Sequence, residues 1–197
     1  MATETPHSTL TTYVSDMHAL VSHGLQAIER QVDNLKDKST KHPEAYAAVR
    51  DFQRTLQAHA SMLDARVNAL GGSSTQPVKD AVSAVAGFAA GLINAVRAEE
   101  ASKSIRDDYT YFSHVAIGYL MLHTTAAGLG DRETAALAET GYRDAARIIM
   151  HIDHIMPTLV LQELREDGLG VTDVTSEALS MVKNAWNREA STTGFAR

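Results

Sequence analysis

The sequence predicts an all-α protein: an antiparallel four-helix bundle with a helical crossover between its two hairpins and an extra C-terminal helix. Apolar residues recur at intervals of three and four along four stretches of similar length, which is the period of an amphipathic helix. Turn and capping residues separate these stretches, and no convincing strand pattern is present. With 197 residues, 44% of them apolar, the chain is long enough to form one domain with a substantial core.

The first two stretches predict a hairpin of two long helices. Ser8 or Thr9 is a natural N-cap for the first helix, which should run for about seven turns. A polar break follows, and Pro43 stands at the first turn of the next helix, where proline is favoured. The second helix should run to Leu70 and end at the glycine pair that follows. Its apolar stripe contains one polar member, His59.

The second hairpin is the stretch around which the rest of the chain is organised. It runs from Asp107 to Leu164 as two long helices joined by a glycine-containing turn, with Asp131 as the N-cap of the second helix. Pro157 should kink that helix or end it. An Ala- and Gly-rich segment, 81–96, precedes this hairpin and is expected to form the crossover. At about 16 residues it is shorter than the roughly 20 that cross a membrane, so no membrane contact is expected.

A last amphipathic helix is expected at about 173–190, and its apolar stripe includes Trp186. The core bundle should span about 9–164, and the whole chain, 1–197, should form a single helical domain. The apolar side of a short amphipathic helix that follows a four-helix bundle must pack against another apolar surface. We therefore expect Trp186 to be substantially buried, either by its own subunit or by a neighbouring one.

Composition excludes several classes of function. The chain has no cysteine, which removes disulfides, zinc ribbons and iron-sulfur ligation and leaves His, Asp, Glu and Met as candidate metal ligands. The formal net charge is -6 and the Lys and Arg residues are scattered singly, so nucleic acid is not an expected partner. The N-terminal sequence lacks a basic region followed by an apolar run, so we expect no secretory signal and a cytoplasmic location.

The nine histidines carry the most information about function. Five fall in a tail, in a loop or off the main apolar lines and are expected to be solvated or to lie at the rim of the bundle: His7, His23, His42, His123 and His154. His59 and His151 lie on the apolar stripes of the second and fourth helices. His18 and His114 lie at the edges of the apolar stripes of the first and third helices. Asp144, one heptad before His151, is the only acid predicted to point inward. We expect His59 and His151 to face each other in the bundle interior.

The predicted order of elements resembles that of the ferritin-like superfamily, and within it that of the YciE/YciF-type bacterial stress proteins. This order is two long helices, a crossover and two further long helices. The likeness extends from Leu10 to about Leu164. The local matches are Tyr13-Val14-Ser15-Asp16-Met17, His59 in a stretch that ends at Leu70, and Tyr119 followed by Ala126 and Leu129-Gly130-Asp131. The resemblance implies the bundle fold, a role in stress and assembly into a homo-oligomer.

Ferritin-like proteins hold a di-metal centre with a carboxylate from each of two helices and a Glu-x-x-His pair from each of the others. This sequence resembles that pattern in its histidines but lacks the acids. The positions that would carry the acids are apolar: Val21, Leu56, Val115 (or Phe112) and Ile148. Two cations in a low-dielectric core with one carboxylate would be costly. The resemblance therefore implies a degenerate di-metal site.

Three interpretations remain open at this point. In the first, the two stripe histidines are buried, neutral and hydrogen-bonded to Tyr119, to Asp144 or to each other, and the protein is non-enzymatic with no cofactor. In the second, the same pair and one of His18, His114 or Asp144 hold a single iron, zinc or copper ion. In the third, a di-metal centre survives. Either metal site would favour a redox or oxygen-handling enzyme.

Overall fold

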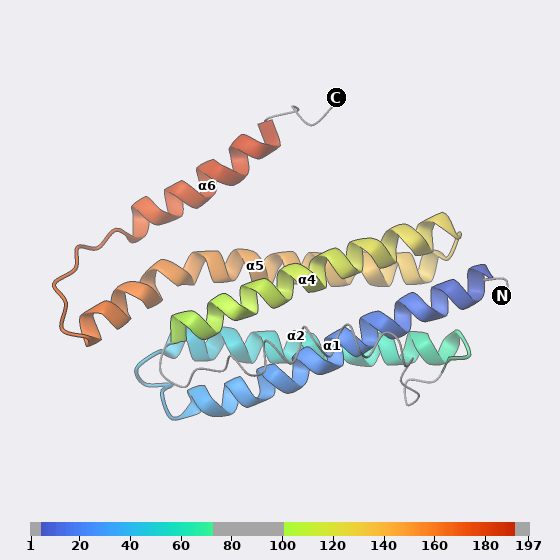
Figure 1. The fold of residues 1–197 in the computed structure, drawn as a ribbon, viewed down its shortest axis with the longest axis horizontal. Coiled ribbons are helices and arrows are strands. Elements are labelled where there is room, and N and C mark those ends of the chain that lie inside the picture. Colours follow the sequence, from blue (N-terminus) through green and yellow to red (C-terminus); the bar gives the residue numbers. More distant parts are fainter. Residues whose placement is uncertain (1–4, 73–100, 192–197) are drawn as a thin grey trace.

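The computed structural model describes residues 5–72 and 101–191 of the chain. Helices make up most of this part of the chain, which contains no strand (Figure 1). The helices are α1 (Pro6–Lys36), α2 (Pro43–Ala69), α4 (Ala101–Gly128), α5 (Arg132–Glu166) and α6 (Thr175–Ser191). The prediction of an all-α protein is confirmed. The expected crossover helix, 81–96, lies outside the described residues.

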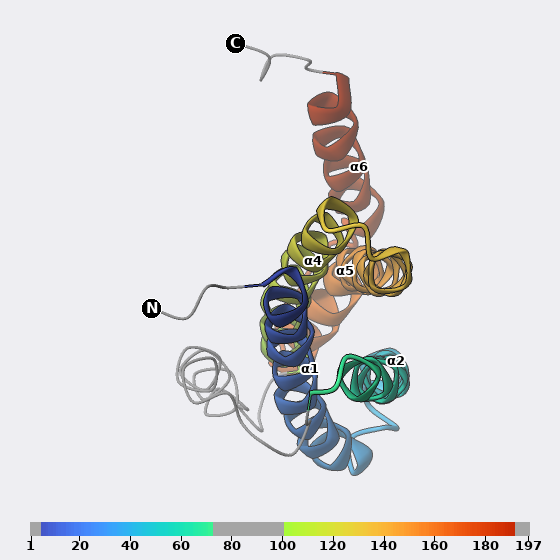
Figure 2. The ribbon, with the colours of Figure 1, turned by 90° about the vertical axis from the view of Figure 1, so that its right-hand side faces the viewer.

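The four long helices pack as two antiparallel hairpins, α1 with α2 and α4 with α5 (Figures 1 and 2). The hairpins meet through α1 against α4 and α2 against α5. The end of α2 lies beside the start of α5, where Arg66 bonds to Asp131, whereas the start of α4 lies beside the end of α5, where Ser102 bonds to Glu163. It follows that α2 and α4 run in the same direction.

The ends of the helices follow capping chemistry, with two departures from the prediction. Thr5, and neither Ser8 nor Thr9, is the N-cap of α1, because the Thr5 and Ser8 side chains form a reciprocal capping box and Pro6 occupies the first turn. The chain is already helical at Ala101, before the predicted start at Asp107. Asp131 caps α5 as predicted: its carboxylate accepts a hydrogen bond of 2.8 Å from the Thr134 N–H.

Pro157 lies inside α5 and does not end it. The helix continues to Glu166, and in Figure 1 its last turns bend away from the axis of the preceding part. A proline removes one backbone hydrogen bond, which permits such a bend. The part of α5 after Pro157 reaches the loop between α1 and α2. There the Gln162 side chain donates to the Lys41 carbonyl, and a carboxylate oxygen of Glu166 lies 3.7 Å from His42 Nε2.

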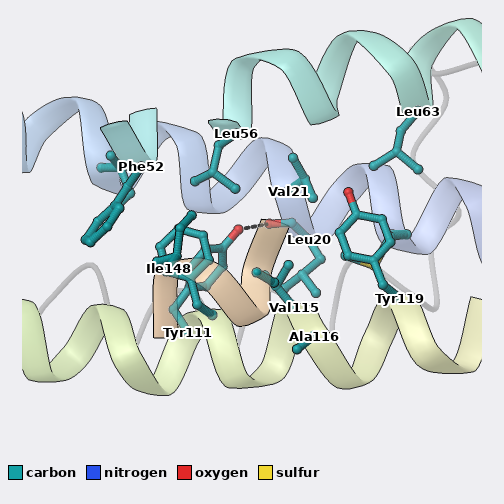
Figure 3. Packing of buried hydrophobic residues seen from close by; sticks show 14 of the residues in the cluster. Leu20, Val21, Phe52, Leu56, Leu63, Tyr111, Val115, Ala116, Tyr119 and Ile148 are labelled. Atoms are coloured by element: carbon teal, nitrogen blue, oxygen red, sulfur yellow. Dashed lines mark hydrogen bonds between the residues drawn. The ribbon is translucent and has the colours of Figure 1, made fainter. Parts of the chain in front are cut away.

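One apolar core is shared by α1, α2, α4 and α5. Close approach of α1 and α4 depends on Gly24, because a Cβ atom at that position would overlap the Tyr111 ring. The Tyr111 hydroxyl donates to the Leu20 carbonyl at 3.3 Å, drawn as the dashed line in Figure 3. Burying a large aromatic side chain against a glycine maximises the contact between the two helices.

Two buried polar clusters also tie helices together. Gln31 of α1 donates to Asp108 of α4 at 2.8 Å, and burial raises the pKa of Asp108 well above its usual range. At the other end of the molecule, Arg66 of α2 is buried and bonds to three acceptors at the start of α5: Asp131, Glu133 and Thr134. These bonds fix how α1 meets α4 and how α2 meets α5.

Helix α6 stands apart from this core. Among the described helices, α5 is the one that α6 contacts extensively. Helix α6 lies on the side of the α4–α5 hairpin that faces away from α1 and α2 (Figure 2). Trp186 is 57% exposed, so the expectation that its own subunit buries it is wrong. No helix in the described part of the chain combines the length and apolarity needed to cross a membrane.

Candidate functional site

A buried chain of three polar side chains crosses the interior between α2, α4 and α5. The Tyr119 hydroxyl lies 3.0 Å from His59 Nδ1, and His59 Nε2 lies 3.1 Å from a carboxylate oxygen of Asp144. His59 is 2% exposed and Tyr119 is fully buried, whereas a quarter of the Asp144 side chain reaches solvent. The chain therefore runs from the centre of the core to the surface of α5.

The chemistry of the partners assigns the protons. An ionised carboxylate only accepts hydrogen bonds, so His59 Nε2 carries the proton and donates to Asp144. Nδ1 is then the bare nitrogen of a neutral ring, and it accepts from the Tyr119 hydroxyl. Asp144 also forms an ion pair with Arg147 one turn further along α5, which anchors the outer end of the chain.

Burial keeps the inner two groups neutral. Desolvation lowers the pKa of His59, although the hydrogen bond to Asp144 opposes that shift. Desolvation and the nearby Asp144 charge raise the pKa of Tyr119 far above its usual range. A neutral imidazole and a neutral phenol are the forms that match the assigned hydrogen bonds.

Gly141 provides the space for the Tyr119 ring. A Cβ atom at position 141 would overlap that ring, so only glycine allows α5 to pass this close to α4 at this level. The Tyr119 and His59 rings meet edge to face, with centroids 5.3 Å apart. The polar chain is therefore enclosed by tight packing.

His151 is not part of this chain, which corrects the expectation that it faces His59. Its ring is half-buried and packs edge-on against Phe52, with centroids 6.3 Å apart. It lines a hollow of about 340 Å³ between α2 and α5, together with Arg54 and Arg147. Since α2 and α5 are antiparallel, the residue opposite His59 is Asp144, and His151 lies two turns further along α5.

The other two histidines proposed as ligands also lie elsewhere. His18 is half-buried and its Nε2 is 3.4 Å from the Ser22 hydroxyl on the same helix, and His114 is exposed on α4. Within residues 5–72 and 101–191, no three His, Asp or Glu side chains come close enough together to hold a metal ion. Of the five predicted ligands, His59 and Asp144 are in contact with each other.

Of the five histidines predicted to be solvated or at the rim, only His42 is buried. His7 and His154 are exposed and His23 is half-buried, but His42 is only 5% exposed because the end of α5 covers it. His123 is half-buried and its Nδ1 lies 3.0 Å from the Ala135 carbonyl. The burial of His42 arises from its contact with the end of α5, which the apolar stripe of a single helix does not reveal.

The four positions that the ferritin-like pattern assigns to acids lie in the core. Each comes from a different long helix, and Figure 3 shows their side chains pointing into the space that the helices enclose. All are at most 5% exposed: Val21, Leu56, Val115 and Ile148. Phe112, the other candidate on α4, is 1% exposed. The residues present therefore do not fit a di-metal centre, which requires several anionic oxygens.

The polar chain itself is poorly suited to catalysis. A Tyr-His-Asp arrangement resembles the hydrogen-bonding order of a nucleophile, a base and an orienting acid. However, the hydroxyl of Tyr119 is enclosed and its raised pKa opposes ionisation, so no substrate atom reaches an activated oxygen. The arrangement can hold α2, α4 and α5 in one register, which is a structural role.

A second feature was missed by sequence reasoning. A hollow of about 580 Å³ lies between α5 and α6 and is lined mainly by apolar side chains, including Met150, Leu179 and Trp186. Met150 is 70% exposed and lies off the α5 stripe. An apolar residue on the polar side of a predicted helix is the signal that could have pointed to this surface.

Comparison of the chain with models of protein families, with curated proteins and with solved structures gives no match.

Proposed function

We propose that the chain is a non-enzymatic, ferritin-like helical bundle protein whose di-metal site has been lost, and that it acts as a stress-associated homo-oligomer in the bacterial cytoplasm. The observation that carries this proposal is the apolar layer at the centre of the four long helices. Each helix supplies one buried apolar side chain where a carboxylate would be needed: Val21, Leu56, Val115 and Ile148. A layer of this composition favours packing over ion binding.

The direction of the helices supports the ferritin-like part of the proposal. Because α2 and α4 run in the same direction, the last residue of α2 and the first residue of α4 lie at opposite ends of the bundle. Ferritin-like folds differ from simple up-and-down bundles in having one long crossover connection. Short loops throughout would instead make α2 and α4 antiparallel.

The contacts of His59 argue against the alternative of a metal-dependent redox or oxygen-handling enzyme. A histidine binds a metal through the lone pair of one ring nitrogen. In His59, Nδ1 accepts from Tyr119 and Nε2 donates to Asp144, so neither nitrogen is available without breaking a buried hydrogen bond. A single-ion site would also need His151, which lies against Phe52.

Thermal unfolding with added metal tests this proposal. A ligand that binds only the folded state raises the melting temperature. We expect Fe²⁺ (without oxygen), Zn²⁺ and Cu²⁺ at low molar excess to raise the melting temperature of wild type no more than that of His59→Leu, the matched control. A rise with one ion that is present in wild type and lost in His59→Leu would overturn the proposal.

A further inference from the structure

Exposed large apolar side chains are confined to one half of the described molecule. None of those that are widely exposed belongs to α1 or α2, and α4, α5 and α6 carry most of them. We call seven of these residues the outer face, leaving out Val160 near the end of α5: Ile117, Leu120, Met121, Tyr142, Met150, Met181 and Trp186. Single exposed apolar residues are ordinary, but a patch that gathers them on adjacent helices marks an interaction surface.

The outer face contains both a projection and a recess. Helix α6 rises from the α4–α5 hairpin on the side away from α1 and α2 (Figure 2). The hollow of about 580 Å³ opens between α6 and α5, and Tyr142, Met150 and Trp186 line it. The Trp186 indole and the Asp153 carboxyl group both line this hollow. A surface that presents a helix beside a groove has a shape that can complement itself.

Charges of both signs occur on the helices that form the outer face. Glu139 and Arg143 form an ion pair on α5, while Asp153 and Lys183 both line the hollow. A surface with a large excess of one charge would repel a second copy of itself and would favour a partner of opposite charge. The mixed signs here allow self-association without such repulsion.

The seven side chains together expose an apolar area close to that which one partner buries in a dimer interface. With the exposed fractions of its seven side chains, and about 200 Å² for a large side chain that is fully exposed, the apolar area is on the order of 700 Å². Stable protein interfaces bury about 800 Å² on each partner. A small peptide or metabolite would leave most of this area in water.

We propose that the outer face docks against the outer face of a second copy of this chain, forming a twofold symmetric dimer in which the groove between α5 and α6 is filled by the partner. This inference deepens the proposed function, since it names the surface through which the proposed oligomer forms. It explains why α6, an amphipathic helix, leaves Trp186 and Met181 exposed in a single chain.

Sedimentation velocity over a wide range of concentrations tests the inference. Met150→Lys and Met181→Lys each place a charge in the proposed interface, whereas Gln57→Lys places the same charge on the exposed side of α2. We expect wild type and Gln57→Lys to form dimers with similar affinity. We expect each Met→Lys change to raise the dissociation constant by roughly tenfold or more. Far-UV circular dichroism verifies that every variant is folded.

Tryptophan fluorescence gives a second readout that requires no substitution. Trp186 is the only tryptophan, so the intrinsic emission reports on the outer face directly. We expect its emission to shift to shorter wavelength as the concentration rises through the dimerisation range, because the partner removes the indole from water.

A wild-type monomer at all concentrations, or a dimer that both Met→Lys variants retain, would overturn the inference. A blue-shifted monomer would also overturn it, because the groove would then be filled by the same chain. Metal binding affects none of these readouts, so the proposed loss of the metal site stands or falls separately.

Discussion

The hydrogen bond between His59 and Tyr119 provides a quantitative test of the buried polar chain. Tyr119→Phe removes the hydroxyl and leaves Nδ1 of a buried imidazole without a partner. His59→Leu leaves the Tyr119 hydroxyl buried without a partner, while Asp144 keeps Arg147 and solvent. The double variant removes both polar atoms from the core at once. The three variants with wild type form a double-mutant cycle.

The magnitudes follow from the burial of each atom. An unpartnered buried polar group costs about 1–3 kcal/mol, so each single variant should lose that much free energy of unfolding. The double variant leaves no orphaned atom inside and adds an apolar side chain, so it should lie within about 1 kcal/mol of wild type. The coupling between the two positions should therefore be about 1–3 kcal/mol.

Urea denaturation followed by far-UV circular dichroism measures these free energies, provided that the dependence on urea is the same in all variants. His151→Leu is the matched control. It makes the same substitution at a half-buried histidine that has no hydrogen-bond partner among the described residues, and it should change stability only slightly. Additive losses in the His59→Leu, Tyr119→Phe double variant would refute the reasoning, because independent sites do not share a buried hydrogen bond.

Three further predictions concern other parts of the core. Gly141→Ala forces the Tyr119 ring to move. Although alanine favours the helical conformation, this change should lower the free energy of unfolding by about 1–3 kcal/mol in urea titrations. A stabilised variant would contradict the close approach of α4 and α5. Because burial raises the pKa of Asp108, its folded state binds the proton more tightly than the unfolded chain, so its contribution to stability falls as pH rises from about 4 through the raised pKa. The melting temperature of Asp108→Asn should accordingly gain on that of wild type as the pH rises above about 4, and a constant difference would count against a buried carboxyl. Arg66→Met removes three bonds to the start of α5 and leaves the partly buried Asp131 without its ion pair. This change should lower the free energy of unfolding by about 1–3 kcal/mol, measured by thermal or urea unfolding. An unchanged stability would show that water replaces these bonds without loss.

The helices were predictable from the sequence because their signals are local. The apolar period, the Asp131 cap and the proline at the start of α2 each act within one or two turns. The N-cap of α1 was misplaced by a turn because two capping residues, Thr5 and Ser8, stand close together and only their reciprocal bonding distinguishes the true cap.

The partners of His59 were only partly predictable. The stripe of α2 correctly indicates that this histidine is buried, and Tyr119 and Asp144 were among its expected partners. The register between α2 and α5 is set by packing across the whole bundle, and it places Asp144 at the level where His151 was expected. Matching the midpoints of two helices misses this shift, since α5 has 35 residues and α2 has 27.

The surroundings of α6 could not be derived from its own pattern. An amphipathic stripe shows that a helix covers an apolar surface but not which molecule provides that surface. The stripe of α6 predicts a buried Trp186, whereas the single chain leaves it 57% exposed.

The metal content of the purified protein tests the central claim most directly. The claim is that the centre of the bundle holds packed apolar side chains and the hydrogen-bonded His59, in place of a metal site. Protein produced in metal-supplemented medium and purified without a chelator should contain iron, zinc and copper at far less than one ion per chain by elemental mass spectrometry, with the same content in His59→Leu. Near-stoichiometric metal in wild type that is lost from His59→Leu would contradict the account.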